Sequence, residues 1–286
     1  YIMKKYVKNI FVLLVMLVLA IHFSAYKTKV YPNQLIQKQY HTQLQQLTFS
    51  SDFFYKKSID FSNQKITKKA LLDSYLELRK AYKKSEFLIN YLDASVIEKF
   101  VNAAPLLHLE ENAPSMNVLQ PEGLQVIDEY LYSDDIEIQV VVELANKLNN
   151  QLKNIIVNHK AIQITDRQIF EAIRMECIRV LTLGITGFDT PVSLQGVNET
   201  QYVFESMANT FQIYADEQPS KKRKKMAKEI VKLLTKGQKY VQKSNNFDTF
   251  NRFEFTQKYI NPVYEKVLEF HLETGVETMY ETQLKQ

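Results

Sequence analysis

The sequence has 286 residues, of which 45% are hydrophobic, so it can bury a substantial core and does not have the composition of a disordered chain. It contains only six Gly and seven Pro, whereas Lys, Glu, Gln, Leu and Ile abound, which favours long helices over a turn-rich β fold. The net charge is +4, and about +1 without the three N-terminal lysines described next, so charge gives no reason to expect a nucleic-acid partner. We therefore predict an all-α protein that binds no nucleic acid.

The N-terminal segment has the pattern of an export signal. After Met3, three basic residues precede an unbroken apolar run over residues 10–21: Lys4, Lys5 and Lys8. The run is shorter than a membrane-spanning helix requires. Cleavage after Ala25 would place Phe23 where a small residue is preferred, so an uncleaved anchor is the alternative to a cleaved signal peptide.

This pattern predicts where the protein works. We expect residues 1–25 to be a signal peptide or short membrane anchor and the protein to be exported to the periplasm or cell envelope. Membrane contact is expected only through this N-terminal segment, with residues 10–25 as the possible anchor. Residues 26–286 are expected to form the folded domain.

Apolar residues recur at intervals of three and four along most of that domain, which is the spacing of amphipathic helices. Thr165 can cap the third predicted helix, Gly184 and Gly187 can end it, and Pro262 predicts a kink or break in the last one. The predicted helices cover residues 66–91, 138–156, 165–183, 197–215, 220–243 and 248–272. Together they indicate a bundle of about six to eight helices.

The most basic run of the chain is Lys-Lys-Arg-Lys-Lys at residues 221–225. Pro219 and Ser220 precede it, and apolar residues at helical spacing follow it. We interpret the run as the exposed start of a helix, in preference to a nucleic-acid patch.

Two irregular stretches interrupt the helical pattern, at residues 105–121 and 186–196. The first contains the acidic pair Glu110 and Glu111, and the second contains Gly-Phe-Asp-Thr-Pro. Loops on a helical scaffold carry most binding chemistry, so these two are the candidate functional loops.

No catalytic or cofactor-binding motif is present in the sequence. A single cysteine, Cys177, excludes an intrachain disulfide, a thiolate metal cluster and Cys-x-x-Cys-His haem attachment, and its apolar surroundings predict a buried side chain. The five histidines are scattered and none lies in His-Glu-x-x-His. We expect no catalytic residue, no metal site and no cofactor in this chain.

One group of polar residues recurs at intervals of three and four within the first predicted helix and therefore lines one side of it. This possible face for a ligand or partner comprises Arg79, Tyr82, Lys83, Glu86 and, further along, Tyr91. The alternative interpretation is an ordinary ladder of ion pairs on the helix surface.

Four stretches together resemble one family. They are Arg-Lys-Ala-Tyr-Lys-Lys-Ser-Glu-Phe-Leu-Ile-Asn-Tyr (79–91), Gln-Pro-Glu-Gly-Leu-Gln-Val-Ile-Asp-Glu (120–129), Leu-Gly-Ile-Thr-Gly-Phe-Asp-Thr-Pro (183–191) and Asn-Phe-Asp-Thr-Phe-Asn-Arg-Phe-Glu-Phe (246–255), followed by Tyr-Ile-Asn-Pro (259–262). In this order they resemble the helical N-terminal region that precedes the catalytic part of some bacterial dihaem cytochrome c peroxidases. That region is related in fold to imelysin-like helical proteins.

The resemblance implies a function for the chain and a partner. The chain would be an envelope-located module that holds or orients partners around a haem peroxidase domain, supplied in cis or in trans. Haem c is expected only in that catalytic part, which would begin where this sequence stops, at Gln286. The resemblance adds candidate loop residues: Pro121, Gly123, Gly187, Phe188, Asp189, Asp248 and Arg252.

A stand-alone imelysin-like protein that binds a metal or small ligand between its helices is the alternative. Imelysin-type peptidases and iron-uptake relatives are associated with Gly-x-His-x-x-Glu, and this sequence has no such string. Peptidase activity therefore has no motif to support it.

Overall fold

The amphipathic stretches fold into helices in the computed structural model, which describes residues 31–104, 108–109 and 118–279. Its longer helices are α2 (Pro32–Ser62), α3 (Lys68–Leu92), α5 (Leu124–Tyr132), α6 (Ile138–His159), α7 (Asp166–Arg179), α8 (Gly196–Glu217), α9 (Lys221–Lys243) and α11 (Asn261–Thr274). Shorter elements are α4 (Ala94–Val96), α10 (Arg252–Phe255) and three π-helical turns, η1 (Ile97–Val101), η2 (Val180–Gly184) and η3 (Thr256–Ile260). The strands β1 (His108–Leu109) and β2 (Val118–Leu119) form a small antiparallel pair in which His108 lies opposite Leu119. The predicted all-α class is confirmed.

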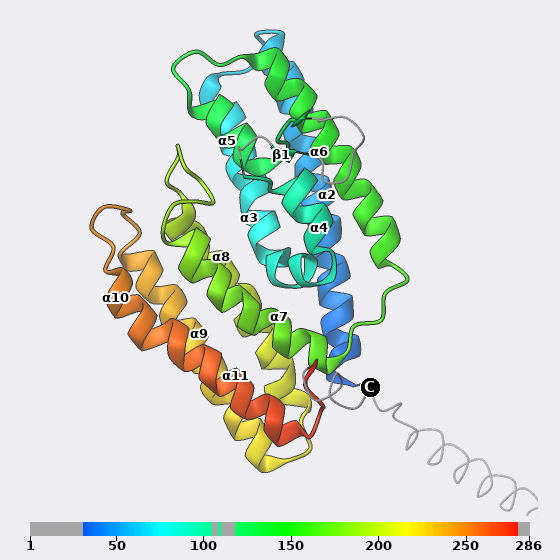
Figure 1. The fold of residues 1–286 in the computed structure, drawn as a ribbon, viewed down its shortest axis with the longest axis vertical. Helices are drawn as coiled ribbons and strands as arrows, with labels where there is room; N and C mark the ends of the chain where they lie inside the picture. The colour runs from blue at the N-terminus through cyan, green and yellow to red at the C-terminus, as the bar shows by residue number, and fades with distance from the viewer. Residues whose placement is uncertain (1–30, 105–107, 110–117, 280–286) are drawn as a thin grey trace, which may run out of the picture. The chain divides into compact units, whose positions relative to one another are not determined.

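The helices from Pro32 onward pack as two neighbouring groups (Figure 1). In one group α2 packs against α3 and α6, and α5 packs against α6. In the other, α8 packs against α9, and α11 packs against α7 and α9. Helix α3 also contacts α7 and α8, so it joins the two groups through the middle of the core.

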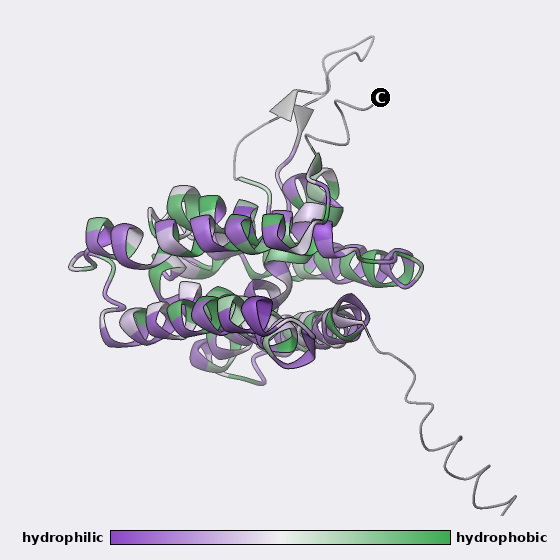
Figure 2. Ribbon diagram, turned by 90° about the horizontal axis from the view of Figure 1, so that it is seen from below, coloured by the Kyte–Doolittle hydropathy of each residue, from purple (hydrophilic) through white to green (hydrophobic). Residues whose placement is uncertain are grey.

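Each helix carries hydrophilic and hydrophobic residues along its length (Figure 2), as expected for helices that bury one stripe in a common core. Leu148, at the centre of the clearest predicted stripe, is buried, and so is Cys177. Burial raises the pKa of the Cys177 thiol to about 12, so the thiol stays protonated and inert. None of the described helices is both long enough and apolar enough to cross a membrane.

The predicted helix ends agree with the structure where a capping residue marks them. Thr165 caps α7 through a capping box with Gln168. The irregularity predicted at Pro262 is also present: the π-helical turn η3 lies between α10 and α11, and Pro262 follows it in the first turn of α11, although residues 252–274 remain helical throughout.

Two of the longer helices were not predicted, and α2 is the larger miss, with 31 residues. Its buried side includes Ser50, Ser51 and Ser58, whereas Phe49 and Phe53 are exposed. Polar residues inside and aromatic residues outside weaken the apolar periodicity on which the prediction relied. The other, α5, has only nine residues and follows directly on the first irregular stretch.

The predictions for residues 1–25, and most of the irregular stretch at 105–121, concern residues that lie outside the described part of the chain.

Candidate functional site

The polar face predicted on α3 is buried, not exposed. Thr67 caps the helix, and the apolar residues Leu71, Tyr75 and Leu78 turn toward the core on the same side as the polar group. Arg79, Tyr82, Lys83 and Glu86 are between 0% and 4% exposed. The interpretation as a ladder of surface ion pairs is therefore wrong, and a partner could touch this face only if the helices moved apart.

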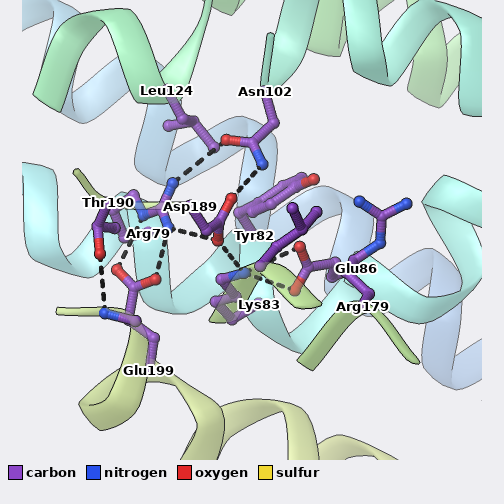
Figure 3. Close-up of polar contacts among 12 residues, drawn as sticks. Arg79, Tyr82, Lys83, Glu86, Asn102, Leu124, Arg179, Asp189, Thr190 and Glu199 are labelled. Carbon is purple, nitrogen blue, oxygen red and sulfur yellow. Dashed lines mark hydrogen bonds and ion pairs between the residues drawn. The ribbon is translucent and has the colours of Figure 1, made fainter. Parts of the chain in front are cut away.

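Arg79 lies at the centre of a charged network (Figure 3). Its Nε and Nη2 donate to the two carboxylate oxygens of Glu199 on α8, at 2.8 and 2.5 Å. Nη2 also donates to Asp189 Oδ2 at 2.9 Å, and Nη1 donates to the side-chain oxygen of Asn102 at 3.3 Å. Such a two-pronged pairing with a carboxylate is the geometry in which a guanidinium binds most strongly.

Asp189 joins the second irregular stretch to the predicted face. Lys83 forms ion pairs with Asp189 and with Glu86, whose two oxygens lie 2.9 and 2.8 Å from Nζ. The other Asp189 oxygen accepts from Asn102 Nδ2 at 2.6 Å and from Gln125 Nε2 at 3.3 Å. The nearby cations Lys83 and Arg79 outweigh the effect of burial and hold the pKa of Asp189 far below its usual range.

The backbone around Asp189 is fixed by short-range contacts. The Asp189 amide donates to the Leu183 carbonyl at 3.1 Å, and the Thr190 hydroxyl accepts from the Gly196 amide at 2.9 Å. Gly187 has a φ of 89°, which favours glycine, and a Cβ there would lie 2.9 Å from the Phe247 ring. These contacts fix the backbone of the loop at residues 186–196, so that the Asp189 side chain points into the core.

Two further charged residues complete the network. Glu176 on α7 is buried next to Glu86, and Arg179, which is mostly buried, lies 3.7 Å from Glu176. We call these seven residues the buried charge cluster: Arg79, Lys83, Arg179, Glu86, Glu176, Asp189 and Glu199.

The buried charge cluster contains three cations and four carboxyl groups, so full ionisation would leave one uncompensated negative charge. Burial and the neighbouring Glu86 raise the pKa of Glu176 well above its ordinary value of 4.5. The raised pKa favours the protonated, neutral form of Glu176, and with Glu176 neutral the cluster as a whole is electrically balanced. Balance of this kind is what allows a group of charges to remain in a protein interior.

Two of the three described π-helical turns flank the cluster. Asn102 directly follows η1, and η2 leads into the loop that carries Asp189. A π-helical turn inserts an extra residue into a helix, often at functional sites, because it redirects the backbone that follows. Here η1 and η2 position the side chains of Asn102 and Asp189, respectively, so that both bind Arg79.

Contacts also link the segments that carry the family resemblance. Gly123 forms a backbone bridge with Asn102, and Arg252 donates from Nε to the Ile185 carbonyl at 2.6 Å. The Arg252 guanidinium also stacks on the Phe247 ring, 4.3 Å from its centroid. Each of the other three segments thus contacts the segment at residues 183–191: Arg79 and Gln125 bind the Asp189 carboxylate, and Arg252 binds the Ile185 carbonyl.

The remaining predicted residues lie at the edge of this region or away from it. Tyr91 is half-buried and donates to Glu171 of α7 at 2.5 Å, away from the charged network. Pro121 lines a hollow of about 270 Å³ beside α5. Phe188 is 70% exposed, and Asp248 is exposed in a turn whose amides are held by Asn246.

Sequence reasoning missed four polar residues of the network around Arg79 and Lys83. Glu199, Asn102, Gln125 and Glu176 were not predicted. One signal was available for Glu199, because it precedes Val203 by one helical turn and so lies on the apolar side of α8. A carboxylate on an apolar stripe indicates a buried cation elsewhere in the chain.

Gly123 is expected to tolerate no side chain. Its φ of 98° and ψ of −160° fall in a region that is essentially restricted to glycine, and a Cβ would lie 2.3 Å from the Val101 carbonyl oxygen. Gly123→Ala should destabilise the fold by about 2 kcal/mol more than Gly275→Ala, measured by urea unfolding. Gly275 is the matched control because its φ is also positive, 73°, but a Cβ there meets no atom within 4 Å. Equal losses for the two variants would contradict the close contact with Val101.

The cluster offers no room for a substrate. The space lined by Lys83, Glu176 and Arg179 is too small to admit a water molecule. Across the described residues no group of three or more His, Cys, Asp or Glu side chains could hold a metal ion. No protein-family model matches the chain, and no curated protein matches it significantly.

Proposed function

We propose that this chain is an envelope-located helical module of a cytochrome c peroxidase-like protein, which holds or orients partners around a haem redox domain. The observation that carries the proposal is that three resembling segments all contact the fourth, at residues 183–191, whose Asp189 belongs to a charge cluster without room for water. A cluster without room for a substrate is suited to fixing a scaffold rather than to catalysis.

The cluster also determines which side chains the scaffold presents. Asp189 is buried, whereas its neighbour Phe188 is exposed, so the ion pairs of Asp189 hold Phe188 at the surface. Phe253, beside Arg252, is 76% exposed, and the Arg252 bond to Ile185 ties this segment to the same loop. Exposed aromatic side chains on a rigid base are the residues that dominate the free energy of protein association. They are the contact points we assign to the haem domain.

The test begins with the coding sequence that follows or neighbours this chain, where the proposal requires two Cys-x-x-Cys-His motifs. With that haem domain in hand, replacing Phe188 and Phe253 by Ser should weaken its association with this chain about tenfold or more, measured by titration calorimetry. If the two regions form one chain, the reaction with the electron donor is the measurement.

The matched control is Phe49→Ser, because Phe49 is 66% exposed on α2, outside the resembling segments. All three aromatic rings are largely in solvent, so thermal stability should change little in any variant. An absence of haem motifs, or equal effects of the control and the test variants, would contradict the proposal.

Export is part of the same proposal and has a separate test. The lysines and the apolar run between Lys4 and Ile21 motivate it. A fusion of residues 3–40 to a reporter that is active only outside the cytoplasm should give an active reporter. Reversing the charge of Lys4, Lys5 and Lys8 in the same fusion should reduce that activity. A reporter that stays inactive with the unchanged segment would refute export.

The alternative, binding of a small ligand by a stand-alone protein, is favoured by one further observation. A hollow of about 410 Å³ beside the start of α2 is lined by amide and basic side chains, including Asn33, Gln37, Lys38, His41 and Gln163. Asn33, Gln37 and His41 already contact the backbone carbonyls of residues 164, 162 and 159, which leaves Lys38 and Gln163 to face a ligand. A stoichiometric metal or small molecule in the purified protein would favour this alternative over the docking module.

A further inference from the structure

Helix α9 carries an unusual concentration of positive charge. It has nine lysines and one arginine against a single glutamate, although the whole chain carries only +4. The helix is therefore strongly basic within a chain whose remaining residues are acidic in sum.

Most of this positive charge lies on one side of α9. At 100° per residue, seven of the lysines fall within a sector of about 80°, opposite the buried residues Ala227, Ile230 and Leu234. All seven are exposed. We call them the α9 lysine stripe: Lys221, Lys225, Lys228, Lys232, Lys236, Lys239 and Lys243. Over the 23 residues of α9 the stripe is about 34 Å long.

The charge of the stripe is not neutralised within the described part of the chain. None of its seven ammonium groups has an acidic partner there, whereas Lys222 and Arg223, which lie off the stripe, contact Glu273. The single glutamate of the helix, Glu229, pairs with Lys266 of α11. Like charges one turn apart repel each other, so this arrangement of lysines lowers the stability of the helix.

The chemistry of the stripe fits a fluid anionic surface better than a folded partner. Protein interfaces are depleted in lysine and rely on aromatic residues and arginine, yet the stripe has neither, and no large apolar residue of α9 is exposed. Mobile ammonium groups suit phosphate groups that can rearrange beneath them. Clusters of four to eight basic residues on a helix are typical of binding to anionic lipid.

We propose that the α9 lysine stripe docks this domain on an anionic phospholipid surface, with α9 lying parallel to the bilayer. The apolar side of α9 is buried in the bundle, so the contact is electrostatic and involves no insertion of α9. It is a second membrane contact, besides the one predicted for the N-terminal segment, and it does not depend on a haem partner.

The test uses the full chain and vesicles of phosphatidylcholine, with or without about one third phosphatidylglycerol. Lysines are labelled with an acetylating reagent and the labelled sites are quantified by mass spectrometry. Anionic vesicles should protect Lys228, Lys232 and Lys236 but not Lys65 or Lys99, and the protection should fade as salt rises. Because labelling is resolved by site, binding through the N-terminal segment cannot mimic this result.

Variants provide the second measurement. Replacing Lys228, Lys232 and Lys236 together by Gln should lower the affinity for anionic vesicles on the order of 100-fold, about fivefold per lysine. The matched control replaces Lys65, Lys68 and Lys99 by Gln, which removes the same charge from exposed positions elsewhere and should have little effect. Folding is not at risk in the stripe variant, because it removes repulsion between lysines one turn apart.

Three results would overturn the proposal: equal labelling with both kinds of vesicle, equal loss of affinity in the two triple variants, or displacement of the protein from anionic vesicles by duplex DNA at equal phosphate concentration.

Discussion

Replacing Arg79 by Met is expected to lower the free energy of unfolding by about 3 to 5 kcal/mol, since the substitution leaves Asp189 and Glu199 buried without their main cation. Methionine keeps most of the volume of the side chain, so the loss reflects charge rather than a cavity. Urea unfolding at neutral pH measures it. If the lost cation is the cause, adding Asp189→Asn to the variant should cost less than the sum of the two single substitutions.

Lys69→Met is the control for this prediction. Lys69 lies on the same helix and also forms an ion pair, with Asp73, but its side chain is 81% exposed. Surface pairs of this kind contribute little to stability, so the control should lose less than about 0.5 kcal/mol. An Arg79 variant as stable as this control would show that the buried charge cluster does not hold the fold together.

Glu176→Gln should stabilise the protein, and by more at higher pH. The raised pKa of Glu176 means that the folded state holds a proton that the unfolded chain releases above pH 4.5. The stability that this proton provides is complete below pH 4.5 and is lost as pH rises toward the folded-state pKa. Glutamine resembles the protonated acid at every pH, so its advantage should grow by about 1.4 kcal/mol per pH unit across that window.

The same variant has an internal control. Below pH 4.5 the wild type and Glu176→Gln should have the same stability, because both then carry a neutral side chain at this position. As the pH falls further, both should lose stability together, since Asp189, whose pKa is depressed, must eventually take up a proton. A difference between the two proteins that does not change with pH would mean that Glu176 is already ionised in the folded state.

Local signals made most of the fold predictable. Thr165 marks a helix start and Pro262 a change in helix geometry, both through backbone effects that depend only on neighbouring residues, and both predictions agree with the structure. Helix α2 was missed because its buried side contains serines whose burial depends on what packs against them. No residue near Ser51 or Ser58 in the sequence carries that information.

The candidate site was predicted in two separate parts. Periodicity placed Arg79 and Lys83 on one face, and loop composition singled out the stretch that contains Asp189. That the loop folds onto the face could not be read from either pattern, because their contact joins residues 110 positions apart. The same distance explains why the face was interpreted as exposed: within α3 alone nothing covers it.

The contacts of Arg79 also constrain the order in which the chain folds. Its partners Asn102, Asp189 and Glu199 lie 23, 110 and 120 positions further along the sequence. Closing such long loops lowers the conformational entropy of the chain, and only completed packing offsets that loss. Removing the guanidinium from water is likewise favourable only when its carboxylate partners are already in place. We therefore expect the cluster to close after the two groups of helices have formed and to join them into one cooperative unit. An N-terminal fragment that ends before α8 lacks Glu199 and leaves Arg79 without its strongest partner, so the nascent chain cannot complete its core until α8 has been synthesised.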